Sequence, residues 1–177
     1  MLKPISEIMG AKLVDLDNCQ NMGKVVNWVI NPDKKQISAL LVKPVGIFAQ
    51  TLAVSTFDIV EYGPKMVIIK NHSALVAPGE LLHLPKRLRQ KNRVMGSPVI
   101  TVSGKKLGNI EDVLFETTDS TLQKIYIKSG LLGILTQPDL IIGVDKIISI
   151  EQKKIIVQDD IDTPQTIKET APVPTTN

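Results

Sequence analysis

The strongest constraint on this chain of 177 residues is an internal repeat. Residues 9–15 return in altered form as residues 95–101, and the apolar run 23–30 returns as 108–115. In both copies a turn, a second apolar run and a final pair of short apolar runs follow. A repeat that occurs only twice indicates a duplicated small domain rather than a solenoid, which needs at least about three repeats. We therefore expect two small units, which need to pack against each other or a partner to be stable.

The apolar runs have the length and composition of β-strands. Isoleucine, valine and leucine predominate and aromatic residues make up only 3% of the chain, a bias that favours strands over helices. The turn signal at residues 31–34 joins two runs into a predicted hairpin. The expected strands of the first copy cover residues 12–15, 24–30, 36–43, 51–55, 59–62 and 66–70.

Asn27 and Asp112 place a polar side chain in the middle of otherwise apolar strands. This pattern indicates either a bulge or bend, as closed small barrels require, or a side chain that faces solvent. The strands also supply enough apolar residues for a core in each unit. The expected core residues are Val25, Val29, Leu40, Val42 and Ile68 in the first copy, with Ile110, Leu114, Ile125, Ile127 and Ile156 in the second.

The repeated pattern resembles the PRC-barrel domain. Its marks are Gly23-x-Val25-x-Asn27 with its repeat at residues 108–112, and a closing Phe57-Asp58 with its repeat at residues 144–145. The resemblance spans residues 5–70 and 94–159. It implies an all-β protein of two tandem PRC-type β-barrels, residues 1–72 and 94–162, joined by a basic linker (73–93, with a possible short helix) and followed by a flexible tail (163–177).

The resemblance implies a docking or assembly module without a shared catalytic motif. The family includes the cytoplasmic domain of the photosynthetic reaction-centre H subunit and a domain of a ribosome maturation factor. This chain has neither the transmembrane helix of the former nor the RNA-facing domain of the latter, so neither role transfers. With no signal peptide and no apolar run near the roughly 18 residues of a membrane span, we expect a cytoplasmic protein. A single cysteine, Cys19, fits a reducing compartment.

Residues suited to catalysis or metal binding are few. The two histidines, His72 and His83, are not spaced as a metal site in either copy, and Cys19 is distant from both in sequence. No nucleophile has a base placed beside it by sequence, and no glycine-rich segment has the lysine and hydroxyl residue of a phosphate loop. We expect a protein that is not an enzyme and that uses no cofactor or metal.

A basic run lies between the two copies. It can contact RNA phosphates, including those of the ribosome, or an anionic membrane surface, or it can be a solvated linker. The net charge of +3 does not by itself indicate a nucleic-acid binder. The candidate anion-binding residues are Lys86, Arg87, Arg89, Lys91 and Arg93.

Two apolar loops sit at matching points of the copies, after each hairpin. Because loops are usually polar, such side chains must be buried against the other unit, a second molecule in a homodimer, or a partner. The candidate interface residues are Ile47, Phe48, Leu131, Leu132, Ile134 and Leu135. The sequence thus predicts an adaptor that docks protein partners, with an accessory factor for ribosome or RNA maturation as the alternative.

Overall fold

The computed structural model describes residues 1–46, 49–81, 94–128, 140–151 and 153–161. These residues form an all-β protein, as the sequence predicts. Their strands lie in two seven-stranded sheets, and the pairings of the described strands do not close into the two barrels that the resemblance implies. The helical segments are short: α1 (Ile5–Ile8) and the single turns η1 (Thr56–Asp58), η2 (His72–Ala74), η3 (Pro78–Glu80) and η5 (Val144–Lys146). No helix in the described part of the chain is long and apolar enough to cross a membrane.

The first half of the chain supplies one sheet. Its strands are β2 (Lys12–Asp15), β3 (Asn21–Asn31), β4 (Gln36–Pro44), β5 (Leu52–Ser55), β6 (Ile59–Gly63), β7 (Met66–Ile69) and β8 (Leu75–Val76). They are arranged in the order β6-β7-β2-β3-β4-β5-β8. β2 and β7 run parallel, and the other neighbours run antiparallel.

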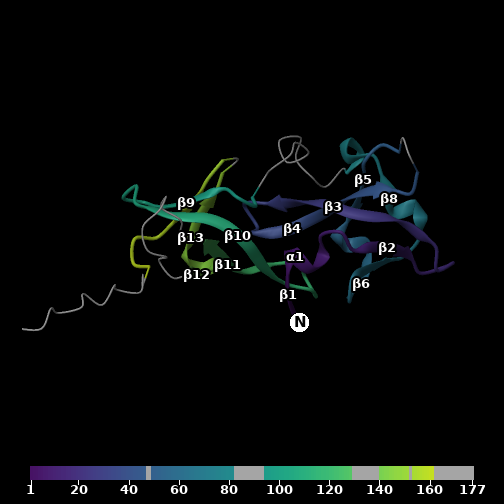
Figure 1. Cartoon of the computed structure of the whole chain (residues 1–177), viewed down its shortest axis with the longest axis horizontal. Helices are drawn as coiled ribbons and strands as arrows, with labels where there is room; N and C mark the ends of the chain where they lie inside the picture. Colours follow the sequence, from purple (N-terminus) through teal and green to yellow (C-terminus); the bar gives the residue numbers. More distant parts are fainter. Residues whose placement is uncertain (47–48, 82–93, 129–139, 152, 162–177) are drawn as a thin grey trace, which may run out of the picture.

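The second half repeats this order. Its strands are β9 (Pro98–Thr101), β10 (Lys106–Glu116), β11 (Leu122–Lys128), β12 (Leu140–Gly143), β13 (Ile147–Ile150) and β14 (Ile155–Val157). The path β13-β14-β9-β10-β11-β12 matches the path from β6 to β5, including one parallel pair, β9 with β14. The two halves lie next to each other along the longest axis of the molecule (Figure 1).

Asn27 and Asp112 lie at β-bulges. The pairing of β3 with β4 shifts between Val25 and Asn27, and the pairing of β10 with β11 shifts between Ile110 and Asp112. Each polar side chain accepts a hydrogen bond from the next backbone N–H, at 2.9 Å for Asn27 and 2.7 Å for Asp112. The bulge interpretation of these residues is therefore confirmed. At each bulge the side-chain oxygen accepts a hydrogen bond from a backbone N–H next to the shift in strand pairing.

The main apolar core runs through both halves as one cluster, with Leu13, Leu40, Phe115 and Ile125 fully buried. Three of the ten expected core residues are wrong. Ile68, Leu114 and Ile156 are only half-buried, and their neighbours point inward instead. The inward residues at these places are Val67, Ile69, Val113, Phe115, Ile155 and Val157.

A second, smaller cluster covers the outer side of the first sheet. Val29, Ala39 and Ala53 are buried there beneath Leu81. Val29 was expected in the main core; it is buried, but on this opposite side of the sheet. The first half is thus packed on both faces of β3, β4 and β5.

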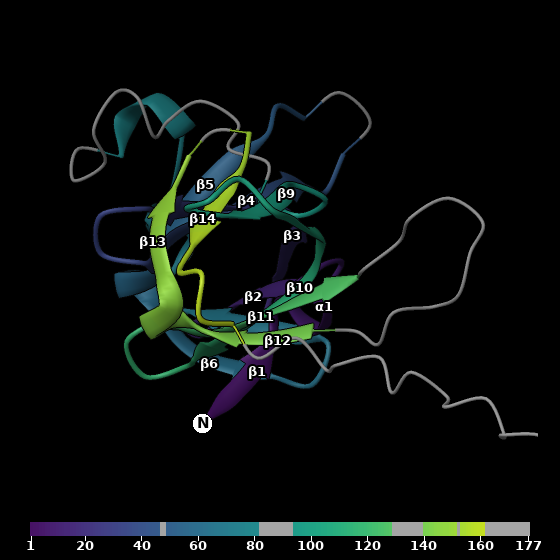
Figure 2. The same ribbon diagram turned by 90° about the vertical axis from the view of Figure 1, so that its left-hand side faces the viewer.

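The N-terminal segment joins the sheet of the other half. β1 (Leu2–Pro4) pairs antiparallel with β10, and α1 packs against the same strand. Ser6 adds two hydrogen bonds to the carboxylate of Asp112, from its backbone N–H at 3.2 Å and its hydroxyl at 2.5 Å. The view onto the second half shows β1 below β11 and β12, with β13 and β14 above them (Figure 2). The two halves are therefore linked by a strand that the sequence did not predict.

Candidate docking surfaces

The candidate site residues named from the sequence lie outside the described residues. This applies to the apolar-loop residues Ile47, Phe48, Leu131, Leu132, Ile134 and Leu135, and to the basic residues Lys86, Arg87, Arg89, Lys91 and Arg93. Both sets stay predictions.

Residues able to bind a metal are not gathered in the described part of the chain, where no group of three or more His, Cys, Asp or Glu occurs. Cys19 is exposed in a turn. His72 is the one histidine described, and its Nδ1 lies 3.8 Å from Oδ2 of Asp15. The Asp15 carboxylate is fully buried and accepts hydrogen bonds from the backbone N–H groups of Asp17, at 2.8 Å, and His72, at 2.9 Å. These contacts fix the chain beyond β2 and β7 and give Asp15 a structural role.

The two halves meet where their long hairpins turn. Gln36 and Thr121 form an isolated antiparallel bridge. Around it, the N–H of Ile37 donates to the carbonyl of Ser120 at 2.8 Å, and the N–H of Leu122 donates to the carbonyl of Lys35 at 2.9 Å. In the repeat, Ile37 is equivalent to Leu122 and Lys35 is equivalent to Ser120. The two hydrogen bonds are therefore equivalent, with the donor in the first half in one and in the second half in the other. This reciprocity is the pattern of a two-fold interface between identical subunits, here built within one chain.

Side chains reinforce this contact unequally. The ammonium of Lys35 reaches the other half and donates to the carbonyls of Val144, at 3.1 Å, and Ile147, at 2.5 Å. The hydroxyl of Ser120, the counterpart of Lys35, lies 3.3 Å from the hydroxyl of Tyr62. Lys35 thus holds the turn η5 and the start of β13, whereas Ser120 holds the end of β6.

Tyr62 completes the contact from the first half. Its ring packs edge-on against Phe115, with ring centres 5.3 Å apart and planes at 71°. Burial raises the pKa of Tyr62 to about 12, although the hydrogen bond to Ser120 lowers it in part. The phenol therefore remains neutral over the physiological range, as a hydroxyl in an apolar contact should.

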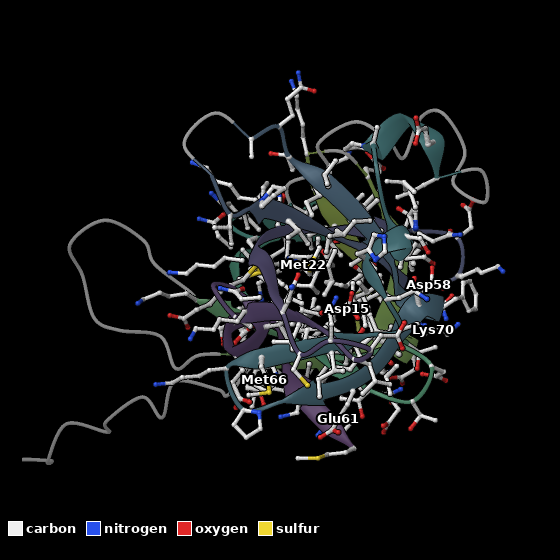
Figure 3. The ribbon with its side chains drawn as sticks, turned by 90° about the vertical axis from the view of Figure 1, so that its right-hand side faces the viewer. Asp15, Met22, Asp58, Glu61, Met66 and Lys70 are labelled. Carbon is white, nitrogen blue, oxygen red and sulfur yellow. The ribbon has the colours of Figure 1, made fainter. Side chains whose placement is uncertain are left out.

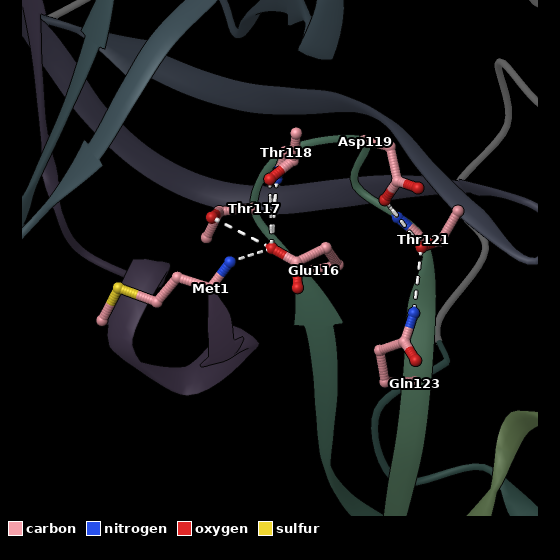
Figure 4. Close-up of polar contacts among 7 residues, drawn as sticks. All are labelled: Met1, Glu116, Thr117, Thr118, Asp119, Thr121 and Gln123. Carbon is pink, nitrogen blue, oxygen red and sulfur yellow. Dashed lines mark hydrogen bonds and ion pairs between the residues drawn. The ribbon is translucent and has the colours of Figure 1, made fainter.

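The turn between β10 and β11 holds the N-terminus (Figure 4). The amino group of Met1 forms an ion pair with Glu116. That contact, ahead of hydrogen bonds from Thr118, lowers the pKa of the Glu116 carboxyl. Across the same turn, hydrogen bonds from Thr121 lower the pKa of Asp119. These contacts are satisfied within the chain, so we assign them to structure rather than to ligand binding.

An apolar patch lies on the outer face of β2, β6 and β7, and we call it the first patch: Val14, Leu16, Val60, Met66 and Ile68. Val14 and Ile68 are neighbours in the parallel ladder, and a bulge makes Val60 and Glu61 oppose Ile68 together. Leu16 and Val60 are 52% and 51% exposed. At the margin, Asp58 and Lys70 form an ion pair at 3.3 Å and lie side by side in Figure 3.

The second half carries the same surface on β9, β13 and β14, and we call it the second patch: Ile100, Val102, Ile148 and Ile156. Ile100 and Ile156 are neighbours in the parallel ladder, and a bulge makes Ile148 and Ser149 oppose Ile156. Val102 and Ile148 are 60% and 52% exposed. An ion pair between Lys146 and Asp160, at 2.6 Å, lies near its margin, with the order of charges reversed relative to Asp58 and Lys70.

The two patches were missed at the level of sequence because their strands are apolar on both faces. In a strand with polar outward residues, alternation identifies the buried side. Here Ile68 stands between Val67 and Ile69, and Ile156 stands between Ile155 and Val157. The signal that identifies the patches is that this two-sided pattern occurs in both copies.

Comparison with known families identifies the second half. Residues 90–163 match the family model of the PRC-barrel domain. Over these residues the chain is similar to the PRC-barrel family. The PRC-barrel match spans β9 to β14 and therefore contains the whole second patch. A comparison with curated proteins found no match.

Proposed function

We propose that the chain is a non-enzymatic adaptor of two tandem PRC barrels that docks protein partners through the first and second patches. The observation that carries this proposal is the presence of the same exposed apolar surface at equivalent strands of both halves. The matched PRC-barrel domain belongs to a family of protein-interaction modules. The expected division into residues 1–72 and 94–162, with a second PRC barrel in the first half, is part of this proposal.

The chemistry of the patches suits a protein surface. Each combines branched aliphatic side chains with a charged margin, the usual anatomy of an interface core and rim. Fully burying one such aliphatic side chain contributes about 1.5–3 kcal/mol. Because these side chains are already partly buried, each gains less than this on docking. Three or four of them supply part of the roughly 4–15 kcal/mol that association costs, and the charged margins supply the specificity of the contact. Because each half has one patch, the adaptor has two docking sites.

The test adds a charge to each patch. In the double variant Val60→Glu with Ile148→Glu, both side chains are about half exposed, so the fold should persist with little change in the melting temperature. Proteins captured by the unmodified chain and quantified by mass spectrometry should be lost. The matched control, Gln20→Glu with Asn109→Glu, adds the same charge at exposed polar positions and should retain them. Retention of every captured protein by the patch variant contradicts this proposal.

The apolar loops remain a second proposed docking element. Replacing Phe48 and Leu132 with Ser should leave each half folded while weakening dimerisation, packing between the halves or partner capture. Thermal unfolding, sedimentation velocity and the same capture experiment provide the readouts. Unfolding of this double variant identifies the two residues as core.

The basic run supports an alternative function as an accessory factor in RNA or ribosome maturation, or a contact with an anionic membrane. Charge reversal of Arg87, Arg89 and Lys91 to Glu should abolish binding to RNA or anionic vesicles, and that binding should weaken at high salt. If the unmodified protein binds neither at low salt, the basic run is a solvated linker. The proposed cytoplasmic location is compatible with either function.

A further inference from the structure

The two halves differ at the strands β5 and β12, which occupy equivalent places in their sheets. β8 pairs with β5, with Ala53 opposite Val76 and Val54 opposite Leu75. No described strand pairs with β12 on the side away from β11. A strand edge without a partner presents backbone N–H and C=O groups that an extended chain can pair with.

The side chains at these edges differ in the same way. Ala53 of β5 is fully buried beneath β8 and Leu81, whereas its counterpart on β12, Ile141, is 57% exposed. The two strands are otherwise alike: Val54 and Ile142 both face the main core and are buried. Thus β12 offers an apolar side chain at the place where the first half has a covered one.

The chain that follows β14 does not repeat the sequence of β8. In the first half, Ala74 packs against the main core and Leu75 and Val76 come next. In the second half, Ile161 packs against the core four residues after β14 ends, and Asp162, Thr163 and Pro164 come next. The apolar pair is lost, and proline has no backbone N–H to give to a ladder.

The outer face beside β12 also differs in charge. Ala39, buried beneath Leu81 in the first half, corresponds to the exposed Lys124 in the second. A segment that covers the outer face of β12 in the second half therefore lies near the ammonium group of Lys124. In the first half, Leu81 lies in the same cluster as the methyl group of Ala39. An acidic residue is the complementary choice at that position.

We propose that the edge of β12 with which no described strand pairs binds an extended segment of another protein by strand addition. The segment has two consecutive apolar residues, which pair with Ile141 and Ile142, and an acidic residue at the place that Leu81 occupies in the first half. This inference rests on the proposed docking function and deepens it, because it names the kind of partner segment that one half takes.

The probe for the test comes from the chain itself. A peptide with the sequence of residues 71–81, which includes β8, and its Leu81→Glu version are titrated into the full-length protein. Hydrogen exchange should show slower exchange of β12 amides on adding peptide, and isothermal titration should show saturable binding. The Leu81→Glu peptide should bind several-fold more tightly than the parent at low salt, and Lys124→Glu in the protein should reverse that preference.

Two variants distinguish the edge from the patches. Ile141→Ser should weaken peptide binding at least about fivefold, whereas Ile148→Ser, a similarly exposed isoleucine of the second patch, should leave it unchanged. Peptide binding that is equal in both variants, or absent at millimolar peptide, overturns the strand-addition proposal. Neither result depends on the capture of proteins by the patches, so the two proposals fail separately.

Two other occupants of the edge are tested in the same experiment. If removing residues 162–177 speeds the exchange of β12 amides and exposes a peptide site absent in the full chain, the chain covers its own edge and the proposal is overturned. If β12 amides slow with protein concentration alone and sedimentation shows a dimer lost in Ile141→Ser, a second copy is the occupant, and the proposal is likewise overturned. A monomer whose β12 amides slow only with peptide supports it.

Discussion

Gln36 and Thr121 lie opposite each other in an antiparallel bridge, and each is the counterpart of the other in the two halves of the chain. An approximate two-fold axis therefore passes between them. Since the hydrogen bonds on either side of the bridge are reciprocal and the apolar core is continuous, the halves behave as the two subunits of a small dimer.

Lys35→Met should destabilise the contact between the halves. The variant removes two hydrogen bonds from a charged donor to the carbonyls of Val144 and Ile147, worth about 1.5–3 kcal/mol when well buried and less at this half-exposed site. We expect a loss of about 1–2 kcal/mol in urea unfolding. The control is Lys34→Met, one residue earlier and exposed. Equal effects of the two substitutions would falsify the role given to Lys35.

Gly23→Ala and Gly108→Ala should each destabilise the fold strongly. Both glycines have φ of +148°, and an added Cβ would lie 2.4 Å from the carbonyl oxygen of Lys43 or Lys128. Because the obstacle is backbone in a paired strand, we expect losses of about 3 kcal/mol or more. Gly79→Ala, where an added Cβ meets nothing within 4 Å, is the control and should be nearly neutral in thermal unfolding. If Gly108→Ala leaves the stability unchanged, the backbone of β11 at Lys128 moves away from the added Cβ at little cost.

Asp15→Ala should cost more than its size suggests. It leaves the backbone N–H groups of Asp17 and His72 without their acceptor beside a fully buried site. Unsatisfied buried donors cost about 1–3 kcal/mol each. Asp15→Asn keeps one acceptor oxygen and should lose less, and Asp17→Ala, exposed, serves as the surface control. Chemical denaturation at pH 7 gives the free energy of unfolding of the three variants. The expected loss is smallest for Asp17→Ala, larger for Asp15→Asn and largest for Asp15→Ala.

Tyr62 should make stability fall at high pH. Its pKa is raised from 10 to about 12 in the folded protein, so the folded state holds the phenolic proton more tightly than the unfolded state does. The stabilisation is complete below pH 10 and is lost as pH rises towards 12, by at most about 2–3 kcal/mol. Tyr62→Phe should remove this part of the pH dependence.

The control for Tyr62 is Tyr126→Phe, since Tyr126 is the other tyrosine and is only half-buried. Urea unfolding at pH 8, 10 and 11.5 compares both variants with the unmodified chain. All other ionisable groups are common to the three proteins, so the differences isolate each phenol. If the free energy of unfolding of Tyr62→Phe depends on pH as that of the unmodified chain does, the phenol ionises without cost in its contact with Phe115.

The sequence predicted the strands well and their faces less well. Strand β2 begins and ends where predicted, and bulges, one of two interpretations of Asn27 and Asp112, occur at both residues. The inward side of β7 was assigned wrongly through Ile68, because both faces of that strand are apolar. Alternation fails where a strand is apolar on both sides, and those strands carry the two patches.

The sequence by itself determined the repeat and the all-β class, because turn residues and branched aliphatics act over a few neighbouring residues. At Asn27 and Asp112 it left a bulge and a solvent-facing side chain as alternatives, and the strand pairing decided for the bulge. Only the tertiary structure decided that β1 joins the sheet of the other half, that Lys35 reaches across the contact, and that β5 is covered by a described strand while β12 is not. These features depend on pairings between residues far apart in the chain. Which distant residues pair depends on the strand edges and carbonyl groups that remain unpaired once each half has folded. A pattern of neighbouring residues does not predict this.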